Sequence, residues 1–215
     1  MEARSLKVLP IDPDHPEPGA IAEAVSALRR GELVVVPTET VYGLAADPGV
    51  PGALEKIYSA KGRPSDKPIT LLAADPEQAT REGAAMGSVG LGLARRFWPG
   101  PLTLVLSTPH GFRGFRVPKY AVTLALLRSV GRVLAVTSAN RSGEPTTVTA
   151  QEAAEAVGGR VSVVLDAGRS PGGVPSTVVR VDGEKVEILR EGAITRNEIM
   201  RVVRGDSSAG RTNDR

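Results

Sequence analysis

The sequence predicts a single α/β domain with a twisted sheet that mixes parallel and antiparallel strands. Helix-like and strand-like patterns alternate along the chain of 215 residues, as they do in α/β folds. No internal repeat and no linker divides the sequence into two cores. Near the C-terminal end, Asp182-Gly183 separates two apolar segments and is a strong two-residue turn signal, so part of the sheet is expected to be antiparallel.

Six segments have the apolar spacing or the end signals of α-helices. In the first two, apolar side chains recur at intervals of three or four residues. The last two open with capping-box spacing, Thr149 with Glu152 and Thr195 with Glu198, which stabilises a first helical turn. The expected helices are residues 19–30, 51–60, 83–97 (as one or two helices), 121–130, 149–157 and 195–203.

Eight short apolar runs are expected as strands. They are rich in Val, Leu and Ile and are bounded by Gly, Pro or polar residues. The first run breaks at Pro37 and leads directly into hydroxyl and carboxylate side chains. The expected strands are residues 32–36, 69–73, 102–107, 114–117, 132–137, 161–165, 176–181 and 185–190.

The composition excludes several classes of protein. The sequence has no cysteine, which excludes a disulfide framework, a thiolate zinc site and a cysteine nucleophile. It shows no apolar signal-peptide core and no run near the roughly 20 apolar residues of a membrane span, so we expect a cytoplasmic protein that does not bind a membrane. The balance of 27 basic to 24 acidic residues is mildly basic, which is only a weak indication of a nucleic-acid partner.

Familiar catalytic motifs are missing from the sequence. Both histidines, His15 and His110, lie beside prolines in expected loops, which argues against a histidine-driven hydrolase. There is no H-E-x-x-H, G-x-S-x-G, Walker A or G-x-G-x-x-G pattern. A bound nucleotide would therefore be held by a site that uses neither the Walker A nor the G-x-G-x-x-G motif.

Five loops near strand ends contain hydroxyls, amides and cations, and strand ends are where open α/β sheets bind ligands. Each loop alone also fits an ordinary turn or a solvated segment, and Gly172-Gly173 fits either a backbone anion nest or a plain turn. Together, without a nucleophile, they favour phosphoryl or nucleotidyl transfer by positioning and charge stabilisation. The loops are residues 37–43, 61–68, 113–119, 136–146 and 172–177.

Seven motifs then occur in a fixed order: PTETVYGL, KGRPSDKP, WPGPLTLVL, RVP, TSANRSGEP, PSTVV and ILREG. With them the chain resembles the YrdC/TsaC family of L-threonylcarbamoyladenylate synthases, in its short single-domain form, over residues 18–192. The resemblance implies a twisted sheet with flanking helices around a concave basic cavity. It also implies synthesis of L-threonylcarbamoyl-AMP and pyrophosphate from L-threonine, bicarbonate and ATP. Partner proteins would then transfer the threonylcarbamoyl group to tRNA next to the anticodon.

The resemblance also implies roles for residues that match the family's motifs. Lys61 and Arg63 would be catalytic by holding the ATP phosphates, and Mg²⁺ is expected with the ATP, without predicted protein ligands. Glu39 would either order its loop or assist the Mg²⁺. The threonine substrate would be bound by Thr38, Thr137 and Ser176. ATP would be bound by Lys61, Arg63, Lys67, Arg116, Ser138, Asn140, Thr146 and Arg190.

The expected organisation is one synthase domain over residues 1–204 and a disordered tail over residues 205–215. The alternative function is an RNA-binding or ribosome-assembly module that uses the same basic cavity, and ATP-independent, strongly salt-dependent tRNA binding would favour it. Weak tRNA binding is also compatible with the synthase. Carbamoyl transfer is disfavoured, because proteins in which a related domain does that work have zinc-finger-like regions and this sequence has no cysteine.

Overall fold

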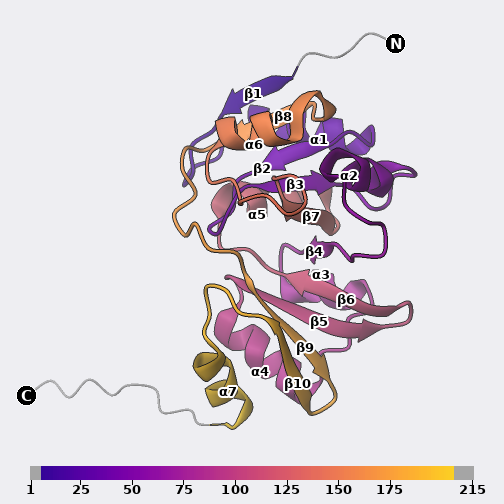
Figure 1. Cartoon of the computed structure of the whole chain (residues 1–215), viewed down its shortest axis with the longest axis vertical. Coiled ribbons are helices and arrows are strands. Elements are labelled where there is room, and N and C mark those ends of the chain that lie inside the picture. The colour runs from indigo at the N-terminus through magenta and orange to yellow at the C-terminus, as the bar shows by residue number, and fades with distance from the viewer. Residues whose placement is uncertain (1–5, 206–215) are drawn as a thin grey trace, which may run out of the picture.

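The structure, a computed structural model, describes residues 6–205 and contains one ten-stranded sheet (Figure 1). The strands are β1 (Lys7–Pro10), β2 (Val34–Val36), β3 (Gly43–Ala46), β4 (Thr70–Leu72), β5 (Leu102–Thr108), β6 (Gly111–Arg116), β7 (Leu134–Ser138), β8 (Val163–Asp166), β9 (Thr177–Asp182) and β10 (Lys185–Arg190). Their order in the sheet is β1-β8-β2-β3-β7-β4-β6-β5-β9-β10. β8 runs parallel to β1 and β2, β4 to β6 and β5 to β9, while the other neighbours are antiparallel, which confirms the mixed sheet.

The helices lie on both faces of this sheet. They are α1 (Pro18–Arg29), α2 (Ala53–Lys61), α3 (Pro76–Arg81), α4 (Gly87–Phe97), α5 (Ala121–Val130), α6 (Ala150–Val157) and α7 (Arg196–Val203), and the 3₁₀ turn Gly158–Arg160 follows α6. Both predicted capping boxes form, with Thr149 and Glu152 at α6 and with Thr195 and Glu198 at α7. The predicted single α/β domain is therefore confirmed in all its expected helices and strands, although several ends shift by a few residues.

Three elements do not follow from the sequence patterns: β1, β3 and α3. The β3 residues Gly-Leu-Ala-Ala include no β-branched side chain, and this segment is a strand because it pairs with both β2 and β7. The helix α3 is too short to show a period, although Asp75 caps it by accepting from the N–H of Gln78 at 2.7 Å. The C-terminal hairpin turn is Gly183-Glu184, one position later than predicted, with Gly183 at φ +61°.

In the half of the sheet from β1 to β7, helices cover both faces. On β2, Val34 and Val36 pack in the core that includes α1 and α5, whereas Val35 packs in the core that includes α2 and α6. The same alternation on β8 and β7 produces apolar strands that are buried on both sides. This explains why these strands appear in the sequence as nearly continuous apolar runs.

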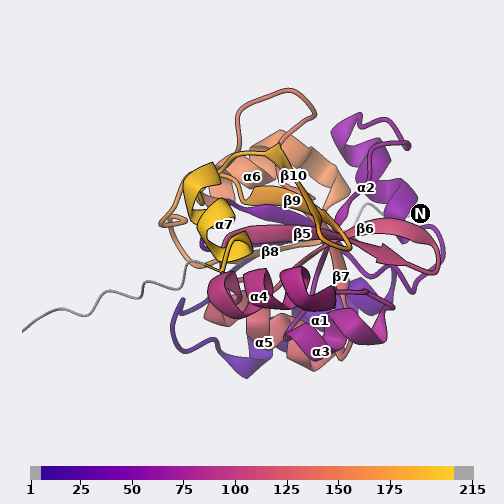
Figure 2. The ribbon, with the colours of Figure 1, turned by 90° about the horizontal axis from the view of Figure 1, so that it is seen from below.

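In the half of the sheet from β6 to β10, the two faces differ. On β5, the fully buried Leu102, Leu104 and Leu106 lie in the same core as residues of α4 and α7. The intervening Thr103 and Val105 point to the other face and line a cavity. Figure 2, seen from below, shows α4 and α7 next to each other at this end of the molecule. The open face of this half of the sheet therefore positions the candidate site.

Two expectations concern regions outside the fold itself. The predicted tail of residues 205–215 lies, apart from Gly205, outside the described residues. Among residues 6–205, no helix combines the length and apolar character that a membrane crossing requires.

Candidate functional site

A cavity of about 360 Å³ is lined by residues from all five predicted loops. Most of the predicted site residues lie on its wall: Thr38, Arg63, Arg116, Thr137, Ser138, Thr146, Ser176 and Arg190. Lys61, Lys67 and Asn140 do not line it, although they belong to the same loops. A larger hollow of about 660 Å³ between α1 and α5 is lined by none of the predicted residues. The fold thus brings eight predicted positions, distant in sequence, to one cavity.

The loop after β2 folds around the buried hydroxyl of Thr38. The Thr38 Oγ1 donates to the carbonyl of Val41 at 2.6 Å and accepts from the N–H groups of Thr40 and Val41 at 3.2 Å each. Because that single hydroxyl hydrogen is used on Val41, the 2.8 Å contact with Thr40 Oγ1 has Thr40 as its donor. The loop is therefore both a hydroxyl-stabilised turn and part of the cavity wall.

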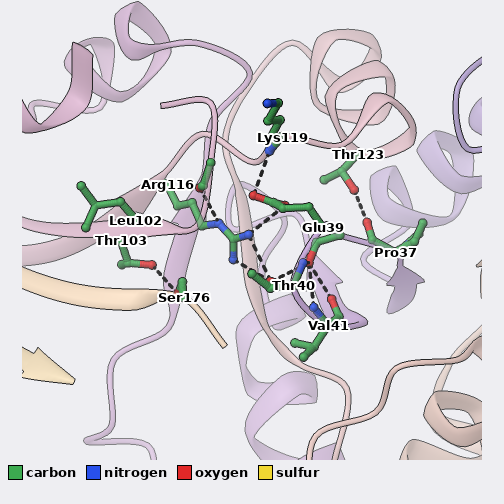
Figure 3. Close-up of polar contacts among 12 residues, drawn as sticks. Pro37, Glu39, Thr40, Val41, Leu102, Thr103, Arg116, Lys119, Thr123 and Ser176 are labelled. Atoms are coloured by element: carbon green, nitrogen blue, oxygen red, sulfur yellow. Dashed lines mark hydrogen bonds and ion pairs between the residues drawn. The ribbon is translucent and has the colours of Figure 1, made fainter. Parts of the chain in front are cut away.

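Arg116 is the centre of a polar cluster on the wall (Figure 3). Its Nε donates to the carbonyl of Gly100 at 3.1 Å, and Nη1 and Nη2 each donate to Thr40 Oγ1 at 3.1 Å. Nη2 also lies 2.8 Å from Glu39 Oε2, as an ion pair whose N–H is not aligned for a hydrogen bond. The two side chains of this pair are 7% and 14% exposed, so water screens their attraction weakly. The guanidinium is therefore positioned by the protein alone.

Glu39 connects three loops of the site. Its Oε1 accepts from the N–H of Lys119 at 3.0 Å, and its carbonyl accepts from the N–H of Gly172 at 3.0 Å. A Cβ on Gly172 would lie 2.5 Å from that carbonyl, so this close approach requires glycine. Gly173 likewise donates to the carbonyl of Thr40 at 2.8 Å. Of the two alternatives for Gly172-Gly173, the structure favours the plain turn over the anion nest, because both N–H groups bind backbone carbonyls. The contacts of Glu39 are those of a residue that orders its loop.

Ser176 and Arg190 form a second polar cluster of the wall. The Arg190 Nε and Nη2 donate to the Ser176 carbonyl at 3.2 and 2.8 Å, and Nη2 also donates to Ser176 Oγ at 3.3 Å. The same Oγ lies 3.0 Å from Thr103 Oγ1. Burial lowers the pKa of Arg190, and the charges of Arg116 and Arg63 lower it further. Three guanidinium groups are therefore close enough around the cavity to repel one another, which favours an anionic ligand.

The loop that follows α2 holds its own cations. Arg63 Nε and Nη2 donate to the carbonyls of Lys67 and Pro68 at 3.3 and 2.9 Å. The backbone N–H of Lys67 donates to the carbonyl of Pro64 at 3.2 Å, while its side chain is exposed. The Arg63 side chain, which lines the cavity, is thus held by bonds within its own loop, whereas the Lys67 side chain lies at the surface.

Lys61, at the end of α2, is buried behind the loop that follows β7. Its Nζ donates to the carbonyls of Ser138 and Asn140, which uses two of its three protons. Burial, followed by the charge of Arg63, lowers the pKa of Lys61 to about 8. Lys61 therefore supports a predicted binding loop from behind, with one donor left over.

The loop after β7 is positioned by β3. Thr137 and Ser138 are register partners of Leu44 and Gly43, so pairing with β3 fixes the start of this loop. Because β3 was not predicted from the sequence, this reason could not be predicted either. Asn140 is buried, and its Nδ2 donates to the carbonyl of Glu144 at 2.7 Å. Its Oδ1 is buried without a hydrogen-bond partner among the described residues, so one acceptor remains available there.

Part of the cavity wall is apolar, and the sequence reasoning did not include it. Phe112, Val105, Val178 and Leu189 line this part, and the Arg180 guanidinium stacks 3.8 Å from the centre of the Phe112 ring. The signal was present in the sequence, because alternate residues of β5 and β9 must face the side opposite to the buried core. The cavity therefore combines a cationic, hydroxyl-rich wall with an apolar one.

Acidic groups are scarce at this site. Among residues 6–205, no cluster of three or more His, Asp or Glu side chains is arranged to hold a metal ion, and none of these residue types lines the cavity. A protein cage of carboxylates for Mg²⁺ is therefore not formed by the described residues.

The sequence matches a protein family over most of its length. The model of the Sua5/YciO/YrdC family, described as telomere recombination, matches residues 26–192. The threonylcarbamoyl-AMP synthase of Bacillus subtilis is 39% identical over 85% of this chain and 56% of its own length. The threonylcarbamoyl-AMP synthase of Vibrio cholerae is 33% identical over 80% of this chain and 97% of its own length. The chain thus spans about half of the first relative and nearly all of the second.

Solved structures agree with the fold. Sua5 of Pyrococcus abyssi in complex with L-threonine has a TM-score of 0.86 and 34% identity, covering 91% of this chain and 60% of that protein. YciO of Escherichia coli has a TM-score of 0.83 and covers 91% of this chain and all of that protein, but at 24% identity it supports the fold alone.

Proposed function

Because this chain belongs to the Sua5/YciO/YrdC family, we propose that it synthesises L-threonylcarbamoyl-AMP and pyrophosphate from L-threonine, bicarbonate and ATP. The product would supply the threonylcarbamoyl modification of tRNA next to the anticodon. The observation that supports this most strongly is the convergence of Arg63, Arg116 and Arg190 around one hydroxyl-lined cavity. Such a site suits a polyphosphate and a small polar amino acid together.

The reaction needs no protein nucleophile, which agrees with the residues that line the cavity. The free amine of threonine takes up bicarbonate to form a carbamate, with loss of water. A carbamate oxygen then attacks the α-phosphorus of ATP, the bond to the β-phosphate oxygen breaks, and pyrophosphate leaves. The protein's contribution is to place the reactants in line and to stabilise the charge that develops on the phosphates.

We assign the residues by their chemistry and place. We assign Thr38, Thr137 and Ser176 to the binding of L-threonine, because hydroxyl groups that bond a substrate hydroxyl discriminate against analogues that lack it. Thr38 Oγ1 donates to the Val41 carbonyl, so Thr38 would exchange that bond in order to donate to the substrate. Arg63, Arg116 and Arg190 stabilise the phosphates, with Ser138 and Thr146 beside them on the wall. Lys61, Lys67 and Asn140, which do not line the cavity, would act by supporting these loops or by moving toward ATP.

Mg²⁺ enters this proposal as part of the substrate. The described residues offer no carboxylate cluster, so the ion would be bound by the ATP phosphates and water and would arrive with them. Partner proteins that transfer the threonylcarbamoyl group and a cytoplasmic location belong to the same proposal.

The test is pyrophosphate release from ATP by the purified protein, with L-threonine and bicarbonate present together or omitted singly. We expect release only when both are present, and threonylcarbamoyl-AMP should appear in equal amount. Release without threonine would point to a different acceptor, and no release under any condition would reject the synthase assignment. The RNA-binding alternative is not favoured, since the relatives described above are named as synthases. It would return only if tRNA bound in the cavity without any ATP turnover.

A further inference from the structure

One face of α7 concentrates positive charge outside the cavity. Arg196, Arg201 and Arg204 are exposed and, with Asn197 and Met200, line a hollow of about 420 Å³. We call these five residues the α7 arginine face. Within the described chain, no acidic side chain lines this hollow. None of the five has a role in the reaction proposed above.

The period of the helix separates this face from the core. Ile199 is fully buried, and Val202 and Val203 pack against the same core, on the side of α7 away from the arginines. A Cβ on Gly92 of α4 would lie 3.9 Å from Val202, which shows how closely the two helices pack. The packing of α7 on α4, which lie next to each other in Figure 2, leaves the arginines of the α7 arginine face exposed to solvent.

The position of α7 relative to the cavity is fixed by hydrogen bonds. Residues 191–195 alone separate Arg190, on the cavity wall, from the first residue of α7. In this connection, Ile194 exchanges two hydrogen bonds with Thr177 Oγ1, at 2.6 and 2.9 Å, and Ala193 donates to the carbonyl of Pro175 at 3.1 Å. A ligand on the α7 arginine face would therefore be held at a constant position relative to the cavity, across the sheet from it.

The surroundings add further positive charge. Arg95 and Arg96, in the last turn of the neighbouring α4, are exposed as well. Two acidic residues offset part of the charge of these five arginines. Glu191 pairs with Arg196 at 3.2 Å, and Glu198 caps α7. The local charge is therefore positive by three, as large as the formal net charge of +3 for the entire sequence.

The spacing of the arginines indicates the class of ligand. At a rise of about 1.5 Å per residue, Arg196 and Arg204 are roughly 12 Å apart along the helix, too far to converge on one phosphate. Guanidinium groups bind phosphate oxygens as two-pronged donors. An extended chain of phosphates satisfies both conditions. We propose that the α7 arginine face binds the phosphodiester backbone of tRNA.

This inference rests on the proposed function, in which the product is destined for tRNA. That product is a mixed anhydride of a carbamic acid and AMP, and water destroys such anhydrides. An RNA bound to the same molecule on this other side of the sheet keeps the acceptor near the synthase, without occupying the site where the anhydride forms.

The test compares two triple variants in their binding of an unmodified tRNA transcript across a salt series. In Arg196→Gln/Arg201→Gln/Arg204→Gln, we expect affinity to fall about tenfold or more and the slope of log affinity against log salt to become shallower by about 2 to 3. The matched control Arg29→Gln/Arg81→Gln/Arg128→Gln removes the same charge from exposed positions elsewhere and should retain most of the affinity.

Pyrophosphate release measured on the same samples separates this inference from the proposed function. Release should be unchanged in both triple variants, because neither touches the cavity. Equal tRNA affinity in the two variants would overturn the inference, and so would displacement of tRNA by ATP, which would place the RNA in the cavity. The wild type could release no pyrophosphate and still bind tRNA through the α7 arginine face. That outcome would overturn the synthase assignment but not the inference about tRNA.

Discussion

Arg116 and Arg190 are bonded to groups on other elements of the fold, whereas Arg63 and Lys67 lie in a loop that bonds mainly to itself. The guanidinium of Arg116 contacts Gly100, Thr40 and Glu39, which come from two segments far apart in sequence. Within the described residues, the side chain of Arg63 bonds only to carbonyls four and five positions further along. We call these two pairs the wall cations and the loop cations.

The difference indicates two ways of supplying positive charge to a polyphosphate. The wall cations are held at fixed positions before the ligand arrives, so they lose little conformational entropy on binding. The loop cations keep more freedom and must be ordered by the ligand. We therefore expect the wall cations to govern the rate of the chemical step, and Arg63, the loop cation that lines the cavity, to contribute mainly to ATP binding.

Replacing Arg116 should have the largest effect. Arg116→Ala should lower kcat by about 10²–10³, as expected for the loss of one preorganised donor. It should also destabilise the fold by roughly 3 kcal/mol, because it leaves the largely buried Glu39 carboxylate without its partner. Pyrophosphate release and thermal unfolding measure the two effects.

The control for this prediction is Arg116→Ala combined with Glu39→Gln. Stability should largely return in the double variant, since the uncompensated charge is gone, while the rate should remain low. Full recovery of kcat would contradict the view that the wall cation acts on the substrate.

Lys61 provides an intermediate effect that depends on pH. Burial lowers its pKa from 10.5 to about 8, so the cation is lost from the folded protein above about pH 8. If catalysis needs that cation, kcat/KM should fall by up to about tenfold per pH unit above this value. Lys61→Arg, which stays charged, should lack this decline and so separates it from the titration of threonine's own amine.

The same pKa shift makes the folded protein more stable as the pH rises, whereas kcat/KM is expected to fall. Between about pH 8 and 10.5 the unfolded chain holds a proton on Lys61 that the folded chain has released. The unfolded state therefore binds more protons, and the free energy of unfolding should rise with pH across this window. Denaturant titrations of the wild type and Lys61→Met measure this free energy of unfolding across the same pH range. An equally large rise with pH in both proteins would argue against Lys61 as its source.

The loop cations should show the smallest effects. Arg63→Ala should raise the KM for ATP by about fivefold to tenfold, with little change in unfolding midpoint, because its bonds lie within one loop. Lys67→Ala removes an exposed side chain and should change KM by less than about twofold. A larger loss of kcat in Arg63→Ala than in Arg116→Ala would reverse the comparison between wall and loop.

The sequence alone determined the parts of the fold whose signals are local. A capping box involves residues three positions apart, and helical apolar spacing repeats within one or two turns, so Thr149, Thr195 and their helices could be predicted. The site loops were predictable for a similar reason, since each places polar groups or cations next to a predicted strand, as Thr38 follows the apolar run that ends at Val36.

Only the tertiary structure decided the features that depend on distant partners. Gly43–Ala46 is a strand because β2 and β7 lie on either side of it, not because of its own residues. Lys61 bonds to carbonyls 77 and 79 positions away, and Glu39 bonds to a backbone N–H 80 positions away. Such contacts form only when the sheet brings its strands together. The spacing of residues along the chain does not indicate which of these distant positions will be close in space.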